Sequence, residues 1–193
     1  MAAIFNSPSK YIQGPGELAK LGSYVEPLGG KALVIVTPSG KKRVGAKIEG
    51  GFAETKAELL FEDFNGECSK GEVDRLVALA RDNGCDIIVG VGGGKIMDLA
   101  KATGETAHLG TVNIPTSAST CAPFTCMSVM YTPEGGKKTS WRFDHEIDAV
   151  YMDLDVIAAC PIRYNAAGIM DAMAKKIEML NGRPEMHIEE NPI

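Results

Sequence analysis

Short apolar runs alternate with amphipathic stretches over the first two thirds of the chain. The runs at 31–37, 57–64, 85–91 and 109–116 predict four strands, because each is brief and bounded by turn-forming or polar residues. The third run, CDIIVGV, is almost continuously apolar, which is typical of a strand covered on both faces. Strands of this kind separated by helical segments favour a Rossmann-like α/β fold with a doubly wound parallel sheet.

The segments between these runs predict helices. Residues 69–84 give the clearest signal, because Ser69 and Glu72 have the spacing of a capping box and apolar residues repeat on one face. A further helix is expected from about residue 95 to residue 107.

The pattern changes beyond Thr116. Residues 126–143 predict a β-hairpin around a Pro-Glu-Gly-Gly turn, and residues 149–155 predict another strand followed by a short helix. A long helix is expected over 161–181, with proline in its first turn and Asn-Gly at its end. The segment 182–193 is polar and predicts an irregular tail.

The composition is that of a globular domain that does not bind nucleic acid. The chain has 193 residues, of which 45% are hydrophobic, and a net charge of −5, whereas nucleic-acid binding depends on a basic surface. No apolar run approaches the roughly 20 residues that span a bilayer, and the first residues do not resemble a signal peptide. The five cysteines are an odd number without a repeated spacing, so we expect a reduced, cytoplasmic protein.

Three consecutive glycines lie between the third predicted strand and the helix that follows it. Gly92, Gly93 and Gly94 allow the backbone to approach a ligand where a Cβ atom would clash. The start of the helix offers free N–H groups and the positive end of its dipole, and Lys95 adds a charge. The pattern favours phosphate binding over a ligand-free turn, although it matches neither the Walker motif nor the usual dinucleotide fingerprint after the first strand.

Two further features flank this turn. Asp98 either braces the turn or contacts a substrate, and the alternative is a solvated ion pair with Lys101. The loop 114–123, with Thr116 and Ser119, follows the fourth strand and is either a solvated turn or a second side of the same cleft.

Four motifs together resemble a known family. GVGGGKIMDLAKA, IPTSASTCAP, SVMYTPEG and AAGIMDAMAK occur in the order and spacing of the glycerol dehydrogenase branch of the metal-dependent, iron-containing alcohol dehydrogenase superfamily, as far as Lys175. The resemblance implies that the glycine turn and Lys95 meet the pyrophosphate of NAD or NADP. The other residues that it implies are Thr116 and Ser119 by the cofactor, Thr125, Met127 and Tyr131 near its nicotinamide half, and Asp171 as a ligand of Zn²⁺ or Fe²⁺. From its place one turn after Gly94, Asp98 is also expected at the cofactor site.

The implied activity is the metal-assisted oxidation of an alcohol or the reverse reduction. Hydride transfer needs the nicotinamide held against the carbinol carbon, and a divalent metal stabilises the alkoxide. The expected substrates are small alcohols, polyols and 2-oxo or 2-hydroxy acids.

Cys121 departs from the glycerol dehydrogenases, which carry a substrate-contacting Asp at this position. The sequence STCAP looks more like the branch that resembles hydroxycarboxylate dehydrogenases. Loss of a carboxylate on the substrate side removes the charge repulsion against an anionic substrate. A 2-oxo or 2-hydroxy acid is therefore favoured over glycerol as the substrate. A nucleophilic role for Cys121 is a minor alternative.

The end of the first predicted strand also departs from the family pattern. Relatives that use NAD carry an Asp there for the adenosine ribose, whereas this chain has Thr37 followed by PSGKKR. A 2′-phosphate could be accepted there, which favours NADP slightly over NAD. The residues that could accept it are Ser39, Gly40, Lys41, Lys42 and Arg43. The alternative is a solvated basic turn.

The family's two histidine metal ligands have no counterpart. None of His108, His145 and His187 stands in a matching motif, and Asp171 alone cannot hold a catalytic metal. We therefore expect an NAD(P)-binding domain over 1–160, the start of a truncated all-α metal-binding domain over 161–181, and the tail over 182–193.

Other functions stay open on the sequence alone. The chain could be a non-catalytic dinucleotide-binding module, a split-gene fragment that needs a partner chain, or a remnant without a ligand. A truncated second domain would expose an apolar helix face, which favours a homo-oligomer or a partner chain. That face comprises Ile169, Met170, Met173 and Ile177.

Overall fold

A parallel six-stranded sheet forms the centre of the molecule. The computed structural model describes residues 7–181 and 189–190. The strands lie in the order β1-β8-β5-β4-β2-β3, and every neighbouring pair is parallel. Their bounds are Lys10–Gly14 for β1, Lys31–Val36 for β2, Glu58–Asp63 for β3, Ile87–Gly92 for β4, Gly110–Pro115 for β5 and Ala149–Asp153 for β8.

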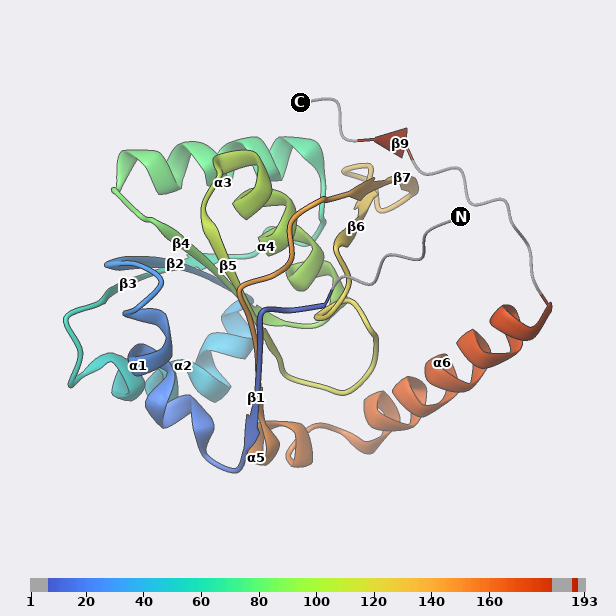
Figure 1. Cartoon of the computed structure of the whole chain (residues 1–193), viewed down its shortest axis with the longest axis horizontal. Helices are drawn as coiled ribbons and strands as arrows, with labels where there is room; N and C mark the ends of the chain where they lie inside the picture. The colour runs from blue at the N-terminus through green and yellow to red at the C-terminus, as the bar shows by residue number, and fades with distance from the viewer. Residues whose placement is uncertain (1–6, 182–188, 191–193) are drawn as a thin grey trace.

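Helices cover both faces of this sheet (Figure 1). The 3₁₀ helix η1 (Glu17–Lys20), α1 (Leu21–Val25) and α2 (Pro38–Phe52) lie on one face. On the other face lie α3 (Lys70–Asp82) and α4 (Gly94–Ala107). The strands are apolar at successive positions because each face packs against its own helices.

Strand β2 illustrates this two-sided burial. Leu33 and Ile35 pack into the cluster with α3 and α4, whereas Val34 and Val36 pack into the cluster with α1 and α2. All four side chains are fully buried. Burying each contributes about 1.5–3 kcal/mol, so the sheet stabilises both layers at once.

The sheet has a topological switch point between β2 and β4. From β2 the chain moves outward to β3, then returns to the other side of β2 to form β4 and continues to β5 and β8. The connections on the two sides of this point diverge, which opens a crevice at the carboxyl ends of β2 and β4.

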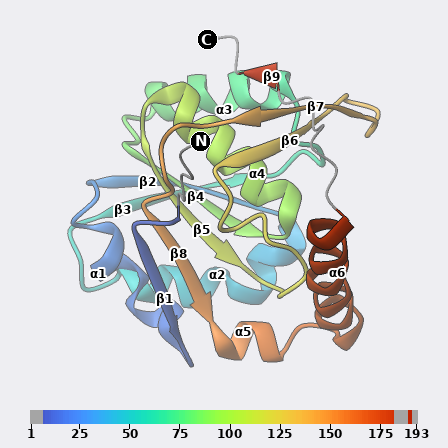
Figure 2. The ribbon, with the colours of Figure 1, turned by 45° about the vertical axis from the view of Figure 1, so that its right-hand side comes forward.

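A hairpin and a separate helix complete the fold. Strands β6 (Met127–Tyr131) and β7 (Lys137–Arg142) are antiparallel, and β9 (Glu189–Glu190) pairs in parallel with β7. After β8 the chain forms α5 (Leu154–Ala158) and α6 (Ile162–Asn181). Figure 2 shows α6 standing beside the sheet and its helices rather than within either layer.

Most expected elements are confirmed. The four strands of the first two thirds, the hairpin, the strand before α5 and the long final helix occur where the sequence predicts them. Ser69 caps α3 by accepting a hydrogen bond from the Glu72 N–H at 3.4 Å. A capping box also predicts a hydrogen bond from the Ser69 N–H to the Glu72 carboxylate. This prediction is wrong, because the Glu72 carboxylate binds Arg75 and Asn65 instead.

Three elements near the N-terminus lack a sequence prediction. Strand β1 is half exposed and polar, and it pairs with β8, from which it is separated by more than 130 residues. The helical turns η1 and α1 are only four and five residues long, too short for a periodic signal. For the expected tail, residues 182–188 and 191–193 lie outside the described residues.

No helix in the described part of the chain combines the length and apolar character needed to cross a membrane.

Candidate functional site: a cleft at the switch point

The glycine turn connects β4 to α4 directly. Gly92 ends the strand, Gly93 is the N-cap of the helix, and Gly94 is its first residue. Gly93 has extended backbone and no side chain to cap the helix, and a Cβ atom built on it would meet nothing within 4 Å. The start of α4 is therefore open to a ligand, and its N–H groups and dipole favour an anion.

A cavity of about 500 Å³ lies at this turn. It is bounded by the carboxyl ends of β2, β4 and β5, which is the position expected at a switch point. The cavity gathers six of the residues that the sequence analysis assigns to the cofactor: Thr37, Ser39, Gly92, Gly93, Thr116 and Ser119.

The start of α2 forms one side of the cavity. Thr37 caps this helix, its Oγ1 atom accepting a hydrogen bond from the Gly40 N–H at 2.9 Å, and lies 3.2 Å from the Ser39 hydroxyl. Arg43 and Lys47, one turn apart on α2, also line the cavity. Lys47 was missed by sequence reasoning, although its spacing of four residues from Arg43 places both on one helix face.

The elements after β8 form the opposite side. Asp155 of α5 and Arg163 of α6 line the cavity. Neither carries a sequence signal for this site, because the approach of α6 to the loop after β5 is a tertiary contact. Helix α6 can come this close to the loop because residue 168 is glycine. A Cβ atom at Gly168 would lie 1.6 Å from the carbonyl oxygen of Ala118.

Two lysines expected at the phosphates lie elsewhere. Lys95 Nζ is 2.6 Å from the Glu67 carboxylate and 4.9 Å from the centre of the Tyr131 ring. Lys41 Nζ lies over the Phe61 ring at 4.6 Å. Neither lysine is among the residues that line the cavity, so the positive charge at the cleft comes from other side chains.

Asp98 is turned into the protein. It pairs with Lys101 at 3.0 Å and accepts a hydrogen bond from the Val129 N–H at 3.1 Å. Both charged side chains are buried, so the expectation of a solvated ion pair is wrong. Burial raises the pKa of Asp98 and lowers that of Lys101. Asp98 braces β6 and does not line the cavity.

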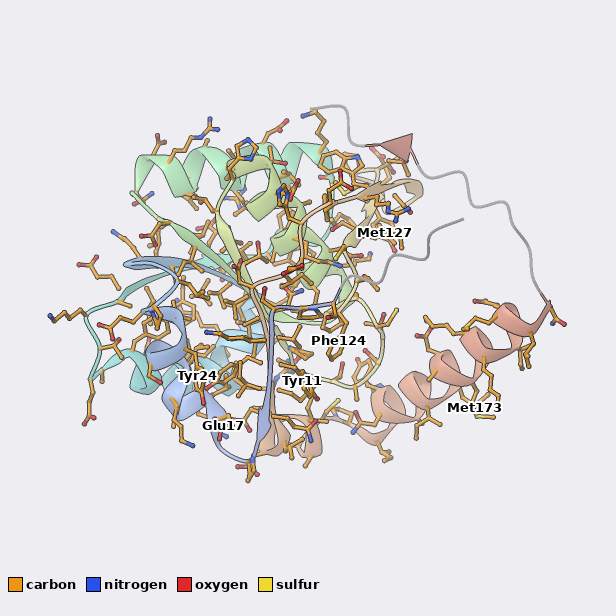
Figure 3. All side chains as sticks on the ribbon, viewed as in Figure 1. Tyr11, Glu17, Tyr24, Phe124, Met127 and Met173 are labelled. Carbon is orange, nitrogen blue, oxygen red and sulfur yellow. The ribbon has the colours of Figure 1, made fainter. Side chains whose placement is uncertain are left out.

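The residues expected at the nicotinamide half lie beyond the cavity on the same loop and hairpin. The backbone carbonyls of Thr125 and Met127 accept hydrogen bonds from Lys101, and Tyr131 lies beside Lys95. Figure 3 shows Met127 where the loop enters the hairpin. Cys121, half-buried, precedes Thr125 on this loop and does not line the cavity.

The described residues do not fit a catalytic metal. Asp171 is partly exposed on α6 and forms an ion pair with Lys175. His108 and His145 border a second cavity, of about 580 Å³, near the start of β5 at the other end of the sheet, and His187 lies outside the described residues. Within 7–181 and 189–190, no three His, Cys, Asp or Glu side chains converge as a metal site.

Comparisons with known proteins agree with this architecture. Residues 8–153 match the iron-containing alcohol dehydrogenase family. The chain is 35% identical to a glycolaldehyde reductase of Halobacterium salinarum and 41% identical to a glycerol dehydrogenase of Pseudomonas putida. Each match covers 92% of this chain and 49% of the relative.

A solved structure extends the likeness to the fold. The crystal structure of a probable glycerol dehydrogenase from Sinorhizobium meliloti 1021 superposes with a TM-score of 0.84 at 38% identity, over 92% of this chain and 48% of that one. The chain thus spans about half the length of the curated relatives that it matches.

Proposed function

The chain belongs to the iron-containing alcohol dehydrogenase family, and we propose that it is the nucleotide-binding part of an NAD(P)-dependent oxidoreductase of small alcohols or 2-hydroxy acids. The observation that carries this proposal is the cavity at the switch point. It combines an uncapped helix start, two glycines that leave the backbone accessible, and hydroxyl groups from two neighbouring loops. This combination suits the pyrophosphate and ribose of a dinucleotide.

The residues of the cavity fit a dinucleotide in a defined order. The N–H group at Gly93 would hold the pyrophosphate, because Gly93 is the N-cap of α4 and the space where its Cβ atom would lie is empty. Thr37 and Ser39 would face the adenosine ribose at the end of β2. The bound nicotinamide would accept or donate the hydride. Thr116, on the loop after β5, would help to orient the pyrophosphate.

The charge of the cavity favours NADP over NAD. Arg43, Lys47 and Arg163 line it, against a single carboxylate, Asp155. A 2′-phosphate near Ser39 would meet the two cations of α2, whereas no acid stands at the end of β2 to bind a free 2′-hydroxyl. Of the cations expected there, Arg43 lines the cavity and is joined by Lys47, whereas Lys41 lies over Phe61.

Titration of the purified chain with NADPH and NADH, followed by nicotinamide fluorescence, tests this proposal. We expect NADPH to bind about tenfold more tightly or better, since charge-assisted hydrogen bonds to one phosphate contribute at least that factor. The variant R43M/K47M should bring the two affinities together. If the unmodified chain binds neither nucleotide, the proposed function fails.

The substrate that we propose is a 2-oxo or 2-hydroxy acid rather than glycerol. Cys121 stands where the resembling glycerol dehydrogenases have a carboxylate, so no negative charge repels an anionic substrate there.

A second candidate function is a non-catalytic dinucleotide-binding module, or a fragment that acts with a partner chain. Within the described residues, Asp171 forms an ion pair with Lys175 and belongs to no cluster of possible metal ligands. Metal analysis after dialysis separates the candidates. Stoichiometric zinc or iron would favour the oxidoreductase, with further metal ligands supplied by another chain. Intact nucleotide binding without any metal would favour the non-catalytic module.

We also propose self-association or a partner chain at α6, and a cytoplasmic location. The apolar side chains of α6 are exposed, with Ile169 at 63% and Met173 at 55%. All five cysteines are free thiols, which suits a reducing compartment.

A further inference from the structure

The ammonium group of Lys101 is enclosed by oxygen atoms. It donates hydrogen bonds to the carbonyl oxygens of Ala122 at 2.8 Å and Thr125 at 3.0 Å, and to that of Met127. Asp98 supplies the balancing charge at 3.0 Å. Lys101 is only 3% exposed, so water does not compete for these contacts.

Three carbonyl groups of one short segment therefore point at a single cation. These carbonyl groups, of residues 122, 125 and 127, surround the ammonium group from several sides. They belong to residues 120–127, called segment 120–127 below. Buried carbonyls without a donor are costly, so this conformation depends on the ammonium. The methylene chain of Lys101 comes from α4, the helix that begins at the glycine turn.

The same segment lies against the glycine turn. A Cβ atom on Gly94 would be 3.2 Å from Thr120 Cγ2 and 3.8 Å from Ala122 Cβ, so these two residues cover the first turn of α4. On its other side the segment is held by Phe124, whose ring centre lies 5.4 Å from that of Tyr11 in β1 (Figure 3).

We propose that Lys101 is a positioning residue for the dinucleotide site. Its ammonium holds segment 120–127 against the start of α4 and thereby fixes the surface that faces the nicotinamide half of the cofactor. Lys101 does not line the cavity at the glycine turn, so it acts through the segment. The inference rests on the proposed function.

The alternative is that Lys101 only stabilises the fold. Ligands that carry one half or both halves of the cofactor distinguish this alternative from positioning. Adenosine 2′,5′-bisphosphate lacks the nicotinamide half, so it would contact Ser39, Arg43 and Lys47 of α2 and, through its 5′-phosphate, the start of α4 at Gly93. NADPH would also contact the surface formed by segment 120–127. Loss of positioning should therefore lower the affinity for NADPH and leave the affinity for the bisphosphate unchanged.

The experiment compares K101M with the double variant D98N/K101M. The double variant removes both charges with similar side-chain volumes, which avoids an unpaired buried carboxylate in case K101M does not fold. K70M is the control, because Lys70 forms an exposed pair with Asp74 on α3. Affinities for NADPH and for adenosine 2′,5′-bisphosphate are measured by calorimetry, together with amide hydrogen exchange.

We expect the double variant to bind NADPH about tenfold more weakly or worse, because the segment must be ordered on binding. Its affinity for the bisphosphate should be unchanged, and exchange should accelerate in residues 120–127 alone. K70M should match the unmodified chain.

An equal loss for both ligands, or no loss for either, would overturn the positioning role while leaving the proposed function standing. If the unmodified chain binds neither ligand, the proposed function fails, and the positioning role fails with it.

Discussion

Gly93 is the residue on which the proposed phosphate site depends most directly. It caps α4 without a side chain, and the space where its Cβ atom would lie is empty. Asp and Asn are among the best N-cap residues, so either should be accepted by the fold at this position. They differ in charge, and the charge decides whether an anion can approach the helix start.

We expect G93D to abolish NADPH binding without lowering the melting temperature. The new carboxylate would cap α4 and occupy the phosphate position with the wrong charge. G93N, of the same shape, should retain part of the affinity. Fluorescence titration and thermal unfolding check both variants, and undiminished binding by G93D would show that the phosphate lies elsewhere.

The lysines show where residue-scale reasoning fails. The sequence places Lys95 at the opening of a phosphate-binding helix, but Glu67 and Tyr131 come from distant segments and hold its ammonium outside the cavity. Lys101, one of many charged residues in sequence, is instead the buried cation. Burial of a charge depends on which segments surround it, and no local pattern reports that.

At the scale of elements, the contact between α6 and the loop after β5 shapes one side of the cleft. Asn165 Oδ1 accepts a hydrogen bond from the Ala118 N–H at 3.3 Å, and Gly168 lets the helix approach the same loop. The loop carries Thr116 and Ser119, and α6 carries Arg163. Movement of the helix would therefore change two parts of the cavity together.

We expect G168A to weaken NADPH binding although alanine favours the helix by about 1 kcal/mol. The added Cβ atom would lie 1.6 Å from the backbone of Ala118, which cannot yield as a side chain would, so α6 must shift. G71A in α3 is the matched control, since its Cβ atom meets nothing within 4 Å. Equal affinities for the two variants would contradict the role of this contact.

At the scale of the whole molecule, the two layers of helices and the separate α6 differ in how they bury apolar surface. The sheet is covered by helices on both faces (Figure 2), whereas α6 exposes large apolar side chains that a single copy of the described chain leaves uncovered. Met173 projects away from the sheet (Figure 3). These side chains are the surface that the proposed self-association would cover.

Sedimentation of the isolated chain should therefore depend on its concentration. I169E and M173E, which place a charge on this face, should shift the chain toward the monomer at each concentration. K176E introduces the same side chain at an exposed polar position of α6 and should leave the association unchanged. A monomer at every concentration, before any substitution, would argue against self-association.

The sequence by itself determined the strands of the sheet other than β1, the helices between them and the glycine turn, because these follow from local periodicity, caps and backbone freedom. It also placed Thr37, Ser39, Thr116 and Ser119 at strand ends that meet at one edge. Only the tertiary structure decided the edge position of β1, the contribution of Lys47 and Arg163 to the cavity, and the enclosure of Lys101. Each of these depends on contacts between segments far apart in the chain, whose free energy is gained only when the whole sheet assembles.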